Sequence, residues 1–79
     1  MERLCDLSPG KTGTVIALQT RGSMRRRLME LGLVEGTKVA CLKKAPWGDP
    51  AAYRIRSAVI ALRKTDAMGV LVKGDGPWE

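Results

Sequence analysis

Histidine, the commonest general base and transition-metal ligand, is absent from this sequence of 79 residues. The two cysteines, Cys5 and Cys41, lie far apart in the chain, and two thiols alone cannot complete a structural zinc site. They are weak candidates for holding a soft transition-metal ion, and the sequence leaves their distance in space open. The N-terminal residues show no apolar signal segment, a context in which two cysteines are typical of reduced thiols.

The acidic residues offer no catalytic pattern. Those considered fall in or beside predicted turns, or on the outer face of a predicted helix, where a solvated surface charge is the expected role. They are Glu30, Glu35, Asp49 and Asp66. The run Gly10-Lys11-Thr12 matches the end of a phosphate-binding loop, but Cys5 stands where the first glycine is required, and a strand is predicted to follow where the motif needs a helix. We therefore expect a protein that is not an enzyme.

Three consecutive arginines, Arg25, Arg26 and Arg27, form the first candidate binding feature. We expect them in the first turn of a helix, where the helix macrodipole disfavours positive charge by about 0.3 to 1 kcal/mol per residue. A residue that goes against a local structural preference, with no compensating interaction, often marks a functional position. The alternative is a solvated helix face on which Arg26 pairs weakly with Glu30, one turn further on.

The second candidate feature is Trp47, in a segment from residue 45 to 50 that contains two prolines and a glycine. This composition predicts a loop, so Trp47 has no strand neighbours to cover it, and tryptophan is enriched among residues that dominate binding energies. Asp49 in the same loop is a further candidate contact. The alternative is that Trp47 folds down onto its own domain. An exposed Trp47 leaves self-association open.

The net charge of +6 suits an acidic protein surface, a nucleic acid or an anionic lipid. Binders of single-stranded nucleic acids usually carry several stacking aromatic residues, whereas this chain has Trp47, Trp78 and Tyr53, the last predicted to be interior. We therefore expect no nucleic-acid partner. No apolar run approaches the roughly 20 residues of a membrane span, so we expect a cytoplasmic protein without direct membrane insertion.

Hydrophobic periodicity and turn residues predict strands at 12–18, 38–44, 51–56, 58–62 and 70–72, with a single helical turn at 64–68. A helix is predicted from Ser23, its expected N-cap, to Leu31. Gly32 should end it in a left-handed conformation, with Leu33 packing back on Leu28.

These elements favour an all-β fold in one domain, residues 1–73, followed by a flexible tail at 74–79. Closing so small a sheet into a β-barrel would protect its edges, with one short α-helix inserted after the first long strand. Leu28 and Leu31 should plug one end of the barrel. The expected interior residues are Val15, Tyr53, Ile55, Val70 and Val72.

Four ordered blocks of residues, spanning about Leu4 to Val72, resemble the pattern of the FeoA family. The first block is Pro9-Gly10 with Gly13 and Val15, and the second is Arg26-Arg27-Leu28 with Leu31-Gly32-Leu33 and Gly36. The third is Ala45-Pro46 with Gly48-Asp49-Pro50, and the fourth is Ile60-Ala61-Leu62-Arg63 with Asp66-Ala67. The chain departs from the family at Ser57, in the turn before the fourth block, where a glycine is common. The departure affects the expected geometry of that turn and not the expected fold.

The resemblance implies an SH3-like β-barrel that serves as a small cytosolic accessory protein of ferrous iron uptake. It further implies binding to the cytosolic GTPase portion of the membrane permease FeoB, which would recruit the chain to the inner face of the membrane. Arg25, Arg26, Arg27, Trp47 and Asp49 are then the expected contacts. The alternative is a metal-ion-binding regulatory barrel similar to the C-terminal domain of iron-dependent repressors, in which Cys5 and Cys41 would hold the ion.

Overall fold

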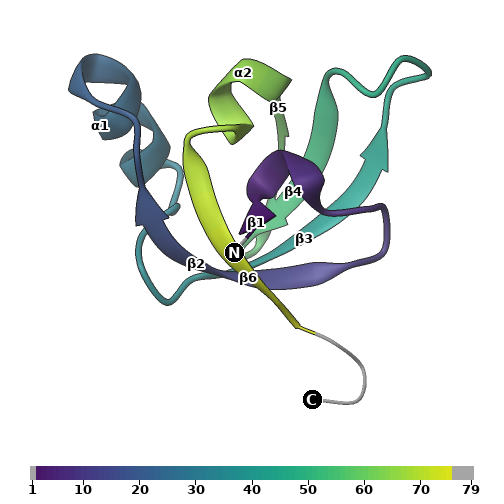
Figure 1. Ribbon diagram of the computed structural model, residues 1–79, viewed down its shortest axis with the longest axis horizontal. Helices are drawn as coiled ribbons and strands as arrows, with labels where there is room; N and C mark the ends of the chain where they lie inside the picture. Colours follow the sequence, from purple (N-terminus) through teal and green to yellow (C-terminus); the bar gives the residue numbers. More distant parts are fainter. Residues whose placement is uncertain (1, 76–79) are drawn as a thin grey trace.

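The computed structural model describes residues 2–75 as a curled antiparallel sheet with helical segments at its margins (Figure 1). The strands are β1 (Glu2–Arg3), β2 (Thr12–Leu18), β3 (Lys38–Lys44), β4 (Ala51–Ile55), β5 (Ala58–Leu62) and β6 (Val70–Asp75). The helical segments are the 3-10 turn η1 (Leu4–Asp6), α1 (Gly22–Glu30) and α2 (Lys64–Ala67). The predicted fold class, mostly β with a short helix after the first long strand, is confirmed.

The sheet has the strand order β1-β6-β2-β3-β4-β5. Its register shifts between Val15 and Ala17 in β2 and between Cys41 and Lys43 in β3, and such irregularities increase strand bending. Among residues 2–75 the two edge strands, β1 and β5, do not pair with each other. The barrel-like curl is completed instead by the contact between η1 and α2.

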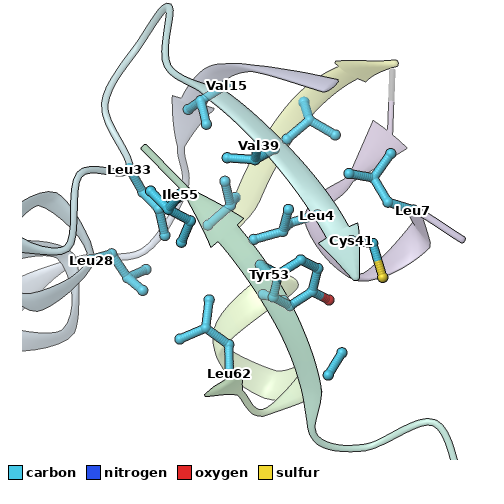
Figure 2. Close-up of a cluster of buried hydrophobic side chains, with 14 residues drawn as sticks. Leu4, Leu7, Val15, Leu28, Leu33, Val39, Cys41, Tyr53, Ile55 and Leu62 are labelled. Atoms are coloured by element: carbon cyan, nitrogen blue, oxygen red, sulfur yellow. The ribbon is translucent and has the colours of Figure 1, made fainter. Parts of the chain in front are cut away.

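The core lies on the concave side of this sheet (Figure 2). All five residues expected inside, from Val15 to Val72, are buried, and Tyr53 is the largest of them. Leu28 is buried as predicted, whereas Leu31 is half-buried and packs against the margin of the core. The alternating exposure of β4, with Tyr53 and Ile55 inside and Arg54 outside, gives the predicted period of two.

The end of α1 is set by Gly32, whose φ of 105° is left-handed. The Gly32 amide donates to the Met29 carbonyl and the Leu33 amide donates to the Leu28 carbonyl, both at 3.0 Å. These two bonds define the predicted Schellman motif, and they bring buried Leu33 back over Leu28. The predicted start was wrong: the N-cap position is Arg21, which makes no side-chain capping bond, and Ser23 lies inside the helix.

The structure also differs from the sequence prediction in two unpredicted elements and two strand ends. The short β1 and η1 were not predicted, and β6 runs through Gly74 to Asp75, into the segment expected as a tail. Residues 76–79 of that expected tail lie outside the described residues. Strand β4 ends at Ile55 because Arg56 takes a left-handed φ of 59° in the turn to β5. No helix in residues 2–75 is long and apolar enough to cross a membrane.

Candidate partner-binding site

The three arginines lie on the exposed surface of α1, whose opposite side buries Leu28 completely. Contrary to the prediction, they do not lie in the first turn, because the helix begins at Gly22. Arg27 is in the last turn, where the macrodipole favours a cation. The prediction that all three arginines oppose the helix macrodipole was therefore wrong. What remains in favour of a binding role is their exposure and their charge.

Arg25 and Arg26 differ in how they are held. The Arg25 Nη1 donates a 3.0 Å hydrogen bond to the Leu18 carbonyl, which ties α1 to the end of β2. Within residues 2–75 the ion pair closer than 4.0 Å joins Lys38 to Asp75, so the pairing of Arg26 with Glu30 that was the alternative to a binding role does not form. The Arg26 guanidinium is thus available to an acidic group of a partner.

Met29 adds an apolar component to the arginine surface, which sequence reasoning missed. Its side chain is 43% exposed and lines a shallow hollow together with Arg25, Arg26 and the acidic Glu30. The signal was present in the spacing, because residues three and four positions apart share one face of a helix. A methionine beside two arginines suits a partner surface with an apolar centre and an acidic rim.

Trp47 is 91% exposed, so it does not fold onto its own domain. It occupies the loop between β3 and β4, where the Gly48 amide donates to the Ala45 carbonyl at 2.7 Å and closes a four-residue turn. The Ala45 amide in turn donates to the Pro50 carbonyl at 3.0 Å, which closes the base of the loop. Trp47 is therefore presented on a loop whose backbone is hydrogen-bonded.

Asp49 has a structural partner within the domain. Its Oδ1 accepts a 2.9 Å hydrogen bond from the Lys64 backbone amide, the first amide of α2. A carboxylate at this position satisfies an amide that a helix leaves without an intrahelical partner. Asp49 thereby ties the Trp47 loop to α2, a role that the sequence did not reveal because residues 49 and 64 are joined only by the fold.

The arginines and Trp47 do not form one continuous surface. In Figure 1, α1 stands at one end of the long axis and the β3–β4 loop stands at the other, with α2 between them. The structure therefore brings Trp47 and Asp49 together in one loop and Arg25, Arg26 and Arg27 together on one helix. The two groups are separate candidate contacts.

The two cysteines are both free thiols near the ring of Tyr53. Cys41 is buried in the core, and burial raises the pKa of its thiol above the ordinary value, although nearby Lys44 opposes this. Burial also raises the pKa of the Tyr53 hydroxyl, with smaller contributions from Cys41 and Cys5. Cys5 is half-buried and, with Trp47, lines a small cavity of about 150 Å³.

The residues around these thiols do not fit a metal ion. Metal coordination by cysteine requires the thiolate, which the raised pKa of Cys41 disfavours at neutral pH. Across residues 2–75, no group of three or more histidine, cysteine, aspartate or glutamate residues is placed to hold a metal ion. Cys5 and Cys41 therefore lack the further ligands that a closed site needs.

Comparisons with known proteins all point to the same family. The model of the FeoA domain matches residues 2–74. A curated relative is the fusion of Fe(2+) transport protein A with the Fe(2+) transporter FeoB from Porphyromonas gingivalis, 34% identical over 71 residues. The match covers 90% of this chain and only 8% of the fusion protein.

Solved structures agree with this result. The zinc complex of FeoA from Stenotrophomonas maltophilia, described as a prokaryotic SH3 domain protein, is 30% identical, with a TM-score of 0.83. The alignment covers 92% of this chain and 91% of that one. A manganese-dependent transcriptional repressor, 22% identical with a TM-score of 0.82 over 92% of this chain and 41% of its own, shares the fold alone. With the family model matching nearly all its residues, this chain belongs to the FeoA domain family.

Proposed function

We propose that this chain is a non-catalytic accessory protein of ferrous iron transport that binds the cytosolic GTPase portion of a FeoB-type permease and modulates it. The observation that carries the proposal is the fusion of a related domain to FeoB in one P. gingivalis polypeptide. A covalent connection keeps two domains at high effective concentration, which suits domains that act on each other. Binding to the permease would place a cytosolic chain at the inner face of the membrane.

The first contact is the arginine surface of α1. Arg25, Arg26 and Arg27 are exposed, and the chain as a whole carries a net charge of +6. An acidic patch on the permease would be attracted over a distance of about 10 Å at moderate salt, which speeds encounter more than it strengthens the complex. Met29 then contributes the apolar area that such a contact needs at its centre.

The second contact is Trp47, which supplies a large rigid side chain at low conformational cost. Its loop is held by the turn hydrogen bond of Gly48 and by the bond from Lys64 to Asp49. Because α1 and this loop stand at opposite ends of the molecule, the partner has to contact both ends or engage two surfaces. The two contributions should therefore be nearly additive.

Calorimetric titration of the full-length permease in detergent with this chain tests the proposal. We expect Arg26→Glu to weaken binding by at least ~1 kcal/mol and Trp47→Ala by ~2 kcal/mol. The double variant should match the sum within about 0.5 kcal/mol. Competition by the isolated GTPase domain would locate the contact on the permease.

Two exposed positions outside both contacts provide matched controls. Lys11→Glu makes a comparable charge reversal on the surface before β2, and Met68→Ala removes an apolar side chain that is 45% exposed. Both should bind like the unchanged chain. Loss of less than ~1 kcal/mol in both Arg26→Glu and Trp47→Ala would show that the proposed contacts are wrong.

Metal-dependent regulation is the second candidate function, favoured by the zinc in the S. maltophilia relative. If Cys5 and Cys41 held the ion, zinc affinity would be lost in a Cys5→Ser/Cys41→Ser variant and would fall as the pH falls. The raised pKa of Cys41 and the missing third ligand argue against this arrangement in residues 2–75. We therefore expect zinc titrations at pH 7 to give the same result with and without the two thiols.

A further inference from the structure

Strand β5 is an edge strand without the usual protection. It ends the strand order of the sheet, and its sequence from Ala58 to Leu62 contains neither a charged residue nor a proline. Val59 is 61% exposed, the largest exposed fraction among the large apolar residues of the described strands. Native edge strands usually carry a lysine, a proline or a bulge, because their free peptide groups invite another strand.

The turn that precedes β5 determines which peptide groups are free. Only Arg56 and Ser57 separate Ile55 from Ala58. Ile55 and Ala58, which flank this two-residue hairpin loop, are register partners. Residues that flank such a loop form a hydrogen-bonded pair, and hydrogen-bonded and non-hydrogen-bonded pairs then alternate. The peptide groups of Val59 and Ala61 therefore turn away from β4, toward the open edge.

Positive charge lies at both ends of this edge. Arg56 is exposed in the turn before β5, and exposed Arg63 follows Leu62 directly. On the outer face of the sheet, Arg54 is the register partner of Val59, so a third guanidinium stands beside the exposed valine. A short apolar edge between two arginines is complementary to an extended segment that has acidic residues at its two ends.

A second copy of this chain fits the same edge poorly. When β5 pairs antiparallel with its own copy so that the outward-facing peptide groups of Val59 and Ala61 meet each other, Ala58 lies opposite Leu62 of the other copy. In that register Arg56 comes to lie opposite Lys64, and like charges directly opposite each other are destabilising. The charges that suit an acidic segment thus oppose pairing of two copies.

We propose that β5 is a docking edge for an extended acidic-ended segment of a partner protein, which adds to the sheet as a further strand. Main-chain hydrogen bonds to Val59 and Ala61 would provide the affinity, and Arg56 and Arg63 would select the acidic ends. This surface is distinct from α1 and from Trp47. It can therefore be tested without the permease.

A synthetic peptide provides the probe: five alternating valine and threonine residues with two glutamates at each end. Titration into the full chain, followed by amide NMR and hydrogen exchange, should perturb residues 56–63. We expect the amides of Val59 and Ala61 to exchange at least about tenfold more slowly at saturation. Arg63→Glu should lower the affinity for the peptide about fivefold or more. Lys11→Glu, a comparable charge reversal away from β5, should leave the affinity unchanged.

Two modified peptides separate strand addition from simple charge attraction. N-methylation of alternate backbone amides keeps every side chain but removes the donors, so binding should be lost if a strand is added. Lysines in place of the glutamates should also abolish binding. Ala61→Pro should have the same effect, because it removes a donor that faces outward and leaves the pairing with β4 intact.

Three results would overturn the proposal. The first is that the N-methylated peptide binds with the same affinity as the unmethylated peptide. The second is a set of shifts in residues 34–40 and Arg54 with none in residues 58–63. Residues 34–40, Arg54 and Arg56 line a groove of about 760 Å³, and such shifts would place the peptide there, on the face of the sheet. The third is a concentration-dependent dimer in sedimentation equilibrium that Ala61→Pro abolishes, because the occupant would then be a second copy.

Discussion

Tyr53 and Trp47, two of the three aromatic residues in the chain, have opposite surroundings. Tyr53 is 1% exposed and Trp47 is 91% exposed. The interior place of Tyr53 was predictable, because it alternates with Arg54 in a strand with one buried face. The exposure of Trp47 was one of two open alternatives, since it depends on the turn at Gly48 and on the bond that Asp49 accepts from Lys64. The second of these bonds joins residues 15 positions apart, and a contact between distant residues leaves no local pattern.

Gly32 is a single residue whose replacement should lower the stability of the fold. Its φ is 105°, and an added Cβ would lie 3.3 Å from the Ile55 side chain and 3.2 Å from Arg56 Nε. We expect Gly32→Ala to lower the free energy of unfolding by about 2 kcal/mol or more, because backbone strain and crowding add. Urea denaturation followed by circular dichroism measures this change.

Gly36 is the matched control for Gly32. Its φ of 90° is similarly left-handed, but a Cβ there meets nothing within 4 Å. Gly36→Ala should therefore cost only the conformational part, about 1 kcal/mol. An equal or larger loss of stability in Gly36→Ala would contradict the crowding described at Gly32.

Cys41 predicts how stability depends on alkaline pH. Burial raises the pKa of its thiol above 9.0, so above that pH the unfolded chain loses a proton that the folded chain retains. The free energy of unfolding should then fall as pH rises, by at most about 1.4 kcal/mol per pH unit for this one group. Urea titrations between pH 8 and 11 measure the slope.

Cys41→Ala isolates that contribution. The variant should be less stable at every pH, because a buried side chain is shortened, but its stability should fall less steeply just above pH 9.0. Burial of Tyr53 adds a further decline only above its ordinary value of 10.0. If the two proteins lost stability with the same slope from the start, the thiol would not be the group responsible.

At the scale of elements, local patterns specified most of the fold. The strands β2, β3 and β5 have the predicted bounds, because turn or loop residues bound each apolar or alternating stretch. The end of α1 at Gly32 was predictable from the Schellman pattern. Its start was not, because Arg21 makes no side-chain capping bond that a pattern could reveal. The two-residue β1 is defined only by its pairing with β6.

Asp49 joins two elements, and its removal should affect them together. Asp49→Ala leaves the Lys64 amide without its side-chain acceptor, which should lower the free energy of unfolding by about 0.5 to 2 kcal/mol. Faster exchange in hydrogen-exchange NMR is expected for the amides of Lys64 and of residues 47–49. Asp49→Asn keeps an acceptor oxygen and should lose less; equal losses in both variants would contradict the hydrogen bond as the cause.

The whole molecule shows why the site was harder to predict than the fold. Sequence reasoning found the arginines and Trp47 as separate features, and nothing in their spacing reported that α1 and the β3–β4 loop stand at opposite ends of the molecule. Met29 joins the arginine surface only through the helical arrangement. The edge position of β5 follows from strand order, which depends on all the strands together.

The net charge of +6 predicts how association with the permease depends on salt. Raising the salt from about 0.05 to 0.5 M should slow the association rate by roughly tenfold and change the dissociation rate less. Replacing Arg25, Arg26 and Arg27 together by glutamine should make this dependence shallower in stopped-flow measurements. An unchanged salt dependence in that variant would show that other basic residues steer the encounter.

Amide chemical-shift mapping can locate both proposed contacts of the chain in one experiment. The chain, labelled with ¹⁵N, is titrated with the cytosolic GTPase domain of the permease, and every amide is followed. We expect shifts or line broadening in two separate regions, residues 22–30 of α1 and the loop of residues 45–49 around Trp47, and none at Lys11. A titration that perturbs neither region at saturating concentrations of the domain would contradict the proposed contacts.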